Sequence, residues 1–261
     1  MQLQNKIALV TGSATGIGEA IARLFAAEGA RLMIHGREGE REAGEAIAAS
    51  LPEAAFCAAN LENPDDCATL VEATVARFGG LDILVNNAAA ITRSNLETTD
   101  VALFDYTIAV NVRAPFLLVK AALPHFRKAG KAGGAHVLNI GSINVYCGEA
   151  VQLAYAVSKG ALMTLTRNLA DAHAREGIRV NQINPGWVLT KNEYALQVRA
   201  GQPADWHEHI SPTFAPSGRI LRPEEIAHFA LAFVSEAGGP VSGAVVDLEQ
   251  YPVIGRNPVK S

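Results

Sequence analysis

Short apolar runs alternate with longer segments of helical periodicity along the whole chain. The runs are apolar throughout, as expected of strands that are covered on both faces. Strands are therefore predicted over residues 6–11, 31–35, 54–59, 81–86, 135–140, 178–183 and 244–248. The intervening segments carry apolar residues at i, i+3, i+4 and i+7, which is the spacing of one helix face. Helices are therefore predicted over residues 17–25, 38–50, 67–78, 100–128, 153–176 and 223–236, with a bend at Pro115.

A helix follows each predicted strand until the last one, and this order indicates parallel strands joined by right-handed crossovers. We expect an α/β fold of the doubly wound, Rossmann-type class, with seven parallel strands and helices on both faces, in a single domain over residues 1–261. Residues 192–222 are irregular, rich in proline and aromatic residues, and too long for a simple loop, so they are predicted to form a substrate lid. Residues 249–261 are predicted to form a C-terminal tail.

Composition narrows the class of protein. Hydrophobic residues make up 49% and charged residues 18%, which supplies a core and argues against disorder. The net charge of −4 argues against nucleic acid or an anionic membrane as the main partner. The scattered cysteines Cys57, Cys67 and Cys147 predict neither a disulfide framework nor a zinc site. The first residues carry no apolar signal core and no run approaches the length of a membrane span, so we expect a cytoplasmic protein.

Three glycines, Gly12, Gly16 and Gly18, join the first strand to the first helix. Glycines permit a tight turn and a close approach of the backbone to a ligand. The helix that follows offers free N–H groups and a positive dipole end to a pyrophosphate. The alternative is a structural glycine-rich turn, but its place after the first strand of a doubly wound sheet favours a dinucleotide. The residues expected to hold it in this loop are Gly12, Ser13, Thr15, Gly16, Ile17 and Gly18.

The end of the second strand bears on the choice of dinucleotide. A dinucleotide site usually has an acid there for the adenosine ribose, but this chain reads His35-Gly36-Arg37. A guanidinium suits a phosphate, so Arg37 favours NADP(H), with NAD(H) possible, and Ser13 is expected to add a hydrogen bond. The alternative is that Arg37 is a solvated charge among neighbouring glutamates.

Tyr155 and Lys159 stand four residues apart on a predicted helix, so they share one face. Ser142 follows the strand 135–140 at the carboxyl edge of the sheet, where ligands bind in such folds. A free tyrosine titrates near 10, and an ammonium about 4–5 Å away supplies roughly the 3–4 kcal/mol that lowers its pKa by about 2–3 units. An ammonium one helical turn away is therefore a sufficient cause for a tyrosine hydroxyl to ionise more easily.

In these positions the chain resembles the short, single-domain branch of the short-chain dehydrogenase/reductase family. The matching residues are Thr11-Gly12-x3-Gly16-Ile17-Gly18, Asn86-Asn87-Ala88, Asn111, Ser142, Tyr155-x3-Lys159 and Asn184-Pro185-Gly186. The resemblance implies that Tyr155 is the acid/base, that Lys159 tunes it and holds the nicotinamide ribose, and that Ser142 positions the substrate oxygen. It implies a water relay supported by Asn111.

The same resemblance assigns the rest of the cofactor site. Asn60, Leu61 and Asn87 would line the adenosine side, and Val188 and Thr190 the nicotinamide end. It also implies a homotetramer or homodimer built on the long helices.

The chain departs from the family pattern in two places. Ala89 stands where the family usually has glycine after Asn-Asn-Ala, and Leu248-Glu249 replaces the usual terminal Gly-Gly. The second change suggests that the tail takes another path, across a subunit interface or near a neighbour's pocket. A loose polar terminus is the alternative.

The expected reaction moves a hydride between the nicotinamide and a secondary alcohol or ketone. The mixture of aromatic and hydrogen-bonding residues near the predicted pocket suits a sugar, polyol or hydroxy acid. The candidate substrate-binding residues are Ser142, Asn144, Tyr146, Gln152, Tyr155, Trp187, Tyr194 and Trp206, with His207 beside them. A 3-oxoacyl thioester reductase and a non-catalytic dinucleotide-sensing protein are the alternatives. No metal is expected, because His207 and His209 do not share a helical face and no third ligand is evident.

Overall fold

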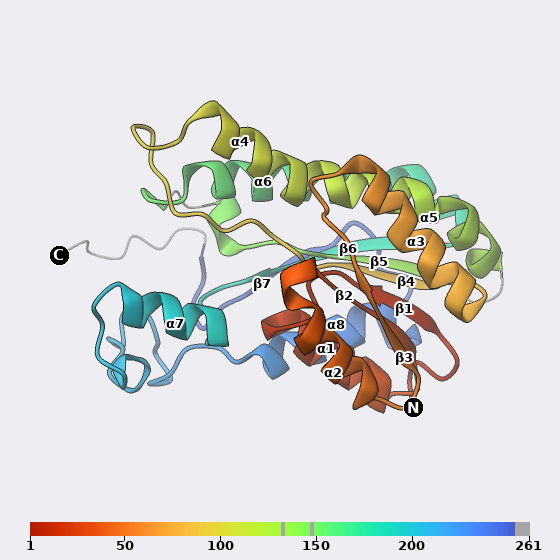
Figure 1. Cartoon of the computed structure of the whole chain (residues 1–261), viewed down its shortest axis with the longest axis horizontal. Helices are drawn as coiled ribbons and strands as arrows, with labels where there is room; N and C mark the ends of the chain where they lie inside the picture. The colour runs from red at the N-terminus through yellow and green to blue at the C-terminus, as the bar shows by residue number, and fades with distance from the viewer. Residues whose placement is uncertain (132–133, 147–148, 254–261) are drawn as a thin grey trace.

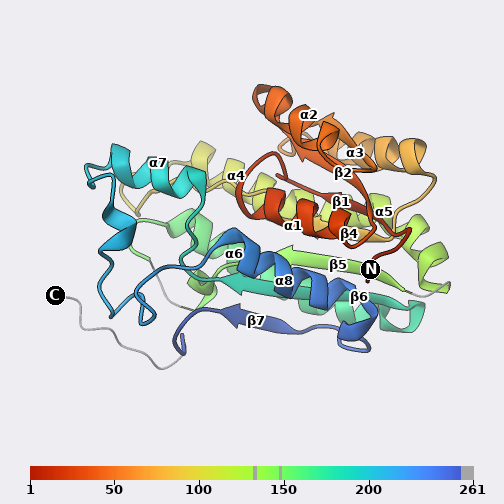
Figure 2. The same ribbon diagram turned by 90° about the horizontal axis from the view of Figure 1, so that it is seen from below.

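Seven parallel strands form one twisted sheet at the centre of the molecule (Figure 2). The computed structural model describes residues 1–131, 134–146 and 149–253, so Cys147 and the tail beyond Val253 lie outside the described residues. The order across the sheet is β3-β2-β1-β4-β5-β6-β7. The strands are β1 (Ile7–Val10), β2 (Arg31–Gly36), β3 (Ala54–Ala58), β4 (Ile83–Asn86), β5 (Ala135–Ile140), β6 (Ile178–Pro185) and β7 (Val245–Leu248). The predicted doubly wound α/β fold is confirmed.

Helices cover both faces of the sheet (Figure 1). They are α1 (Gly16–Ala27), α2 (Arg41–Ala49), α3 (Pro64–Phe78), α4 (Val101–Ile108), α5 (Ala114–Lys131), α6 (Leu153–His173), α7 (Lys191–Arg199) and α8 (Pro223–Val234). One core packs α1, α2 and α8 against the sheet through residues such as Phe25 and Ile226. The other core packs α3, α5 and part of α6 on the opposite face through residues such as Leu70 and Phe126.

The long helix predicted over residues 100–128 is interrupted. A π-helical turn over Ala109–Arg113 separates α4 from α5. Pro115 follows this turn; it has no N–H for the carbonyl of Asn111 four residues earlier, and its ring would clash with that carbonyl in a regular α-helix. The segment Val101–Gly130, which comprises α4, the π-helical turn and most of α5, is long and apolar enough to cross a membrane by length and composition alone. Its fully buried residues, including Leu118 and Phe126, pack in the core, and a buried core helix passes the same test.

Smaller differences occur at the ends of predicted elements. The helix predicted from Glu38 begins as a 3₁₀ turn over Glu38–Glu40, and the one predicted to end at Glu176 finishes as a 3₁₀ turn over Ala174–Glu176. The predicted irregular lid contains a helix, α7, which the sequence pattern did not indicate. None of the residues of α7 is buried, so it has no apolar stripe for a periodicity argument to detect.

A row of polar side chains crosses the sheet from β4 to β7. Each member donates a hydrogen bond to the next, with donor–acceptor distances of 2.7–2.9 Å. The row runs through Asn86, Asn139, Thr166, Gln182, Asn184 and Asp247. Asn86 pairs in register with Asn139, and Asn184 with Asp247, so the row follows the strand ladder. Neighbouring strands that carry the two halves of the site are thereby tied together.

Candidate active site

The glycine loop after β1 adopts the shape that a phosphate cradle needs. Gly12 and Gly16 have φ values of 63° and 60°, in the left-handed region that favours glycine. A Cβ on Gly18 would collide with the carbonyl of Gly12, so the loop closes tightly on the first turn of α1. Thr15 precedes α1 without a side-chain capping bond, which leaves the first N–H groups of the helix available to an anion. The loop therefore fits the pyrophosphate of a dinucleotide.

Asn87 and Thr11 hold this loop against the end of β4. The Asn87 side chain donates to the carbonyls of Thr11 and Gly12, at 2.9 and 3.1 Å. The Thr11 hydroxyl accepts from the backbone N–H groups of Asn87 and Ala88, at 3.0 and 3.1 Å. Asn87 thus shapes the cradle through bonds that its amide makes to the loop itself.

Ser13 and His35 join the same loop to β2. The Ser13 hydroxyl donates to the carbonyl of Val10 at 2.6 Å and accepts from the N–H of His35 at 3.0 Å. Ser13 is fully buried, so the expectation that its hydroxyl adds a hydrogen bond to a phosphate is wrong: the hydroxyl faces the interior. The His35 ring accepts from the N–H of Gly12 at its Nδ1 atom, at 2.9 Å, while its Nε2 atom lies 3.2 Å from the carbonyl of Ala59.

A pocket of about 520 Å³ opens beyond the end of β2, on the expected adenosine side. Its lining comprises Arg37, Glu38, Gly39, Glu40, Asn60, Glu62 and Tyr106. Two of the predicted residues, Arg37 and Asn60, therefore meet there, while Leu61 is buried beside them. Sequence reasoning missed Tyr106, which comes from α4, because nothing local links it to residues some 70 positions earlier.

Arg37 is not a free cation in this pocket. Its guanidinium lies 3.8 Å from the Glu40 carboxylate, which also accepts a 2.8 Å hydrogen bond from the backbone N–H of Arg37. The Arg37 side chain is 67% exposed, so this pair is weak and a bound phosphate could displace it.

Ser142, Tyr155 and Lys159 meet at the carboxyl edge of β5. Ser142 is the second residue beyond the end of β5 at Ile140, and its side chain hydrogen-bonds to the Tyr155 hydroxyl. Lys159 Nζ lies 5.5 Å from the centre of the Tyr155 ring and donates to the carbonyl of Ile140 at 2.7 Å. The predicted shared face of Tyr155 and Lys159 is present.

Burial dominates the titration of this pair. It raises the pKa of Tyr155 to about 12, against a smaller lowering by the hydrogen bond with Ser142. Burial lowers the pKa of Lys159 to about 8. The predicted lowering of the Tyr155 pKa is therefore not found in the protein alone, because burial disfavours the charged form of both groups.

Asn111 lies in the π-helical turn, and its side chain contacts α6 through Ser158. Its Oδ1 atom accepts from the N–H of Ala90 at 2.7 Å, and its Nδ2 atom donates to the carbonyl of Ala90 and to Ser158, at 3.0 and 2.9 Å. Ser158 precedes Lys159, so Asn111 is one residue removed from the lysine that it was predicted to serve. Both hydrogens of its side-chain amide are occupied by these contacts.

One wall of the expected substrate site follows Ser142. The Asn144 side chain donates to Gln152 at 2.8 Å, and the N–H of Asn144 donates to the Ser142 hydroxyl at 3.2 Å. Ser94, in the loop after β4, pairs with the backbone of Val151 and Leu153 and closes this wall. Tyr146 is 38% exposed at its rim.

The lid and the segment just before it supply the aromatic residues. Trp187 and Trp206 stack with ring centres 5.5 Å apart, and His207 meets Tyr194 edge-on at 5.6 Å. Trp206 is buried in the lid's own apolar cluster, so the structure gives it a packing role rather than the open surface expected of a substrate contact. Glu193 accepts from the Trp187 indole at 2.9 Å.

The lid approaches the phosphate loop and the opposite wall. Thr190 caps α7 by accepting from the N–H of Glu193 at 3.0 Å, and a Cβ on Gly16 would lie 3.5 Å from the Thr190 side chain. Val188 pairs with Leu221 at the base of the lid. Arg93, on the wall, lies 4.0 Å from Glu193. Thr190, which was predicted at the nicotinamide end, thus lies beside Gly16 of the glycine cradle.

The described residues contain no group of three or more His, Cys, Asp or Glu side chains that could hold a metal ion. His209 instead pairs with Asp205 at 3.0 Å.

Comparison with known proteins agrees with this geometry. A family model described as Enoyl-(Acyl carrier protein) reductase matches residues 12–249. The cis-4-hydroxycyclohexanecarboxylate dehydrogenase of Sinomonas cyclohexanicum is 34% identical, with 94% of this chain and 95% of that protein covered. The solved structure of a 3-ketoacyl-(acyl-carrier-protein) reductase from Brucella melitensis complexed with NADH gives a TM-score of 0.83 at 30% identity, covering 94% of this chain and 97% of that one. The Pseudomonas aeruginosa RhlG/NADP active-site complex gives 0.85 at 32% identity, covering 95% and 96%.

The family match spans both halves of the site, from the glycine cradle to the turn beyond β7. A glycine cradle for a dinucleotide and a buried Ser-Tyr-Lys group stand at one edge of a doubly wound sheet. The chain therefore belongs to the short-chain dehydrogenase/reductase family and is an oxidoreductase that uses a nicotinamide dinucleotide.

Proposed function

We propose that the protein is an NADP(H)-preferring dehydrogenase or carbonyl reductase that acts on a secondary alcohol or ketone of a small hydroxylated molecule. The observation that carries the proposal is the Ser142–Tyr155–Lys159 group beside the glycine cradle. A sensor that only binds a dinucleotide needs the cradle but not this group, so catalysis is favoured over sensing.

Each residue has a definable task in the reaction. When bound, the nicotinamide donates or accepts the hydride. Tyr155, a neutral phenol at pH 7 with its pKa about 12, gives its proton to the carbonyl oxygen during reduction. Ser142, already bonded to Tyr155, holds the same oxygen. Lys159 donates a hydrogen bond to the carbonyl of Ile140 at the end of β5. Its ammonium group thereby lies near Tyr155 and stabilises the phenolate that forms when the tyrosine gives up its proton.

The preference for NADP(H) rests on Arg37. Its side chain lines the adenosine pocket, is mostly exposed, and has only a weak ion pair with Glu40 to give up. A guanidinium binds a 2′-phosphate through charge-assisted hydrogen bonds, whereas the Glu38, Glu40 and Glu62 carboxylates nearby reduce that gain. We expect a preference of about tenfold rather than an exclusive choice.

The substrate is proposed to be a sugar, polyol or hydroxy acid. Asn144 and Gln152 offer amides on one wall, and Tyr194 and Trp187 offer aromatic faces from the lid. The related dehydrogenase from Sinomonas cyclohexanicum is named for a hydroxy acid, which supports this class. A 3-oxoacyl thioester reductase is the second candidate, supported by the solved Brucella melitensis reductase.

The protein is further proposed to be cytoplasmic and to form a homotetramer or homodimer. Exposed apolar side chains on the helical face support self-association, namely Val101 on α4, Phe116 on α5 and Val157 on α6. Light scattering on the purified protein tests this directly.

The deciding experiment is a panel of alcohols and carbonyls followed at the NAD(P)H absorbance band with both cofactors. Wild type should turn over at least one hydroxylated substrate. Tyr155→Phe should bind NADPH as wild type does and lose about 10²–10⁴-fold in kcat, the range for removing a general acid. Turnover by Tyr155→Phe at the wild-type rate would refute the assignment, and no turnover by wild type would favour the sensor.

A further inference from the structure

The residues that replace the family's terminal glycines fold back onto the lid. Glu249 and Gln250 directly follow β7. The Glu249 side chain contacts Trp187, in the segment just before the lid, and the Gln250 side chain contacts Ser217 and Arg219, near the end of the lid. They make these contacts within one chain. The predicted path of the tail across a subunit interface concerns residues 249–261, most of which lie outside the described residues.

Glu249 acts at the entrance of the lid. Its carboxylate accepts from the backbone N–H of Trp187 at 3.1 Å. The same oxygen lies against Gly186, so closely that any side chain there would collide with it. Glu249 therefore sits directly on the Pro185–Gly186 turn, between β6 and the lid.

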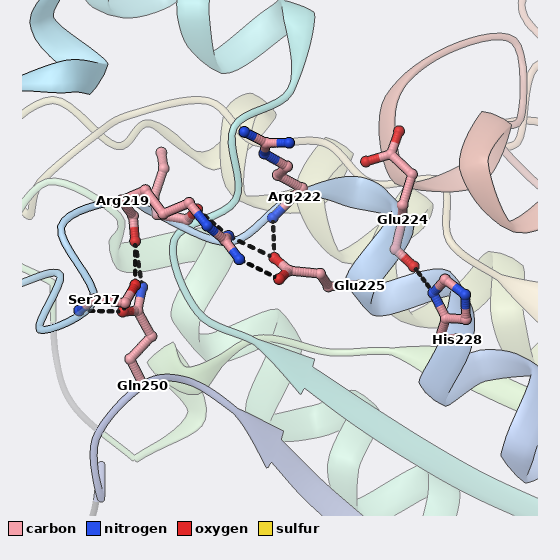
Figure 3. A network of polar contacts seen from close by, with 8 residues as sticks. Ser217, Arg219, Arg222, Glu224, Glu225, His228 and Gln250 are labelled. Atoms are coloured by element: carbon pink, nitrogen blue, oxygen red, sulfur yellow. Dashed lines mark hydrogen bonds and ion pairs between the residues drawn. The ribbon is translucent and has the colours of Figure 1, made fainter.

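Gln250 acts at the exit of the lid (Figure 3). Its Oε1 atom accepts from the N–H and the hydroxyl of Ser217, at 3.0 and 2.6 Å, and its Nε2 atom donates to the carbonyl of Arg219 at 2.6 Å. Arg219 in turn forms two bonds with Glu225 on α8, at 3.0 and 2.7 Å. The exit is thus fixed to the tail on one side and to α8 on the other.

The two ends of the lid are also bonded to each other. Leu189 donates to Leu221 at 2.8 Å, and Leu221 donates to Trp187 at 3.0 Å. Trp187 is consequently held at three points: its backbone by Glu249 and Leu221, its indole N–H by Glu193, and its ring by Trp206. Thr190, which faces the glycine cradle, follows three residues later.

We propose that Glu249 and Gln250 form a strap that fixes the base of the lid and so positions Trp187 and Thr190 for the cofactor and substrate. This inference rests on the proposed function of residues 192–222 as a substrate lid. Glu249 and Gln250 are positioning residues: they touch the lid, not the reacting atoms. Their loss should weaken binding more than it slows the proton transfer at Tyr155.

The chain provides its own reporter for this test. It has two tryptophans: Trp206 lies within the lid, and Trp187, in the segment just before the lid, stacks on it. Intrinsic tryptophan fluorescence therefore reports the lid and its base, and trypsin cleavage after Arg199, on the exposed end of α7, reports the opening of the lid. Neither measurement needs turnover.

The variants are Glu249→Ala, Glu249→Gln and Gln250→Ala, with Glu236→Ala as the matched control. Glu236 lies beyond α8, and its carboxylate makes no hydrogen bond or ion pair with the residues that the structure describes. Glu249→Ala and Gln250→Ala should shift the emission to the red, speed cleavage at Arg199, and raise KM for substrate about tenfold, with kcat within about threefold of wild type. Glu249→Gln keeps an acceptor oxygen for Trp187 and should retain most of the wild-type behaviour.

The outcomes separate the strap from the proposed function. If Glu249→Ala matches Glu236→Ala in emission, cleavage and KM, the strap is refuted. The positioning role is equally refuted if emission and cleavage change while KM does not. If wild type turns over no substrate, the proposed function fails, but the emission and cleavage arms still decide whether the strap exists.

Discussion

His35 shows how one buried side chain sets the shape of the cofactor cradle. Its Nδ1 atom is the acceptor for the N–H of Gly12, the glycine that packs most closely against Ala88. With Nε2 directed at the carbonyl of Ala59, the ring acts as a neutral spacer between the loop and β3. The loop geometry therefore depends on an acceptor at this position.

We expect His35→Leu to weaken NADPH binding by about tenfold, because the buried N–H of Gly12 loses its partner. His35→Asn places an amide oxygen near the Nδ1 position and should bind NADPH within about threefold of wild type. Fluorescence titration of NADPH at pH 7 measures both. Equal affinities of the Leu and Asn variants for NADPH would show that the His35 ring contributes by packing and not as a hydrogen-bond acceptor.

Arg179 joins three secondary-structure elements through hydrogen bonds, at the place where β6, α8 and β7 meet. Its guanidinium donates to the carbonyls of Ser235, Gly238 and Val241, at 2.7, 2.9 and 3.4 Å. These carbonyls lie at the end of α8 and in the loop that leads to β7, where no helical N–H remains to satisfy them. One side chain thus closes the end of a helix onto its neighbouring strand.

Replacing Arg179 by Met should lower the free energy of unfolding by about 2–3 kcal/mol, since hydrogen bonds from a charged donor are lost and the carbonyls are left unpaired. Arg179→Lys should recover part of this loss, because a single ammonium cannot reach all three carbonyls. Urea unfolding at pH 7 measures the effect. A loss below about 0.5 kcal/mol for the Met variant would mean that water replaces the guanidinium fully.

The elements themselves were predictable wherever local pattern decides the structure. The strands, the glycine cradle and the Tyr155–Lys159 pair follow from apolar runs, glycine spacing and a four-residue separation. The π-helical turn at Asn111 and the helix α7 do not, because neither leaves a distinct periodicity in the sequence. Tyr106 and Glu249 also escaped prediction, since their contacts join segments far apart in the chain. The Ser13 hydroxyl was predicted to face the phosphate but points into the interior, because a sequence does not say which side of a loop faces the ligand.

Two buried histidines make the stability of the whole protein sensitive to acid. Burial lowers the pKa of His35 to about 4 and that of His136 to about 3, from 6.5 in the unfolded chain. As the pH falls from 6.5 towards 4, the unfolded chain takes up protons that the folded protein refuses, so the free energy of unfolding decreases. His35 alone should cost about 3 kcal/mol by pH 4.

Urea unfolding between pH 7 and pH 4 tests this expectation. The His35→Asn variant has no imidazole to titrate there and should lose less stability over the same interval. Glu176 and Glu225, whose ion pairs with Arg127 and Arg219 lower their pKa values to about 2, act only below about pH 4.5, where their protonation removes those pairs. A profile that stays flat from pH 6.5 to 4.5 would contradict the assignment to the histidines.

The polar row from Asn86 to Asp247 bears on how the sheet finds its correct alignment. Strands that are apolar on both faces bury similar surface when one slides along its neighbour, so hydrophobicity alone distinguishes such misalignments poorly. A slip of one residue in β5 or β6 would turn an amide away from the row and orphan the groups on either side of it. The row thereby penalises misaligned pairing among β4, β5, β6 and β7. It also holds the end of β4, beside the cradle, in register with the end of β6, after which the chain leads to the lid.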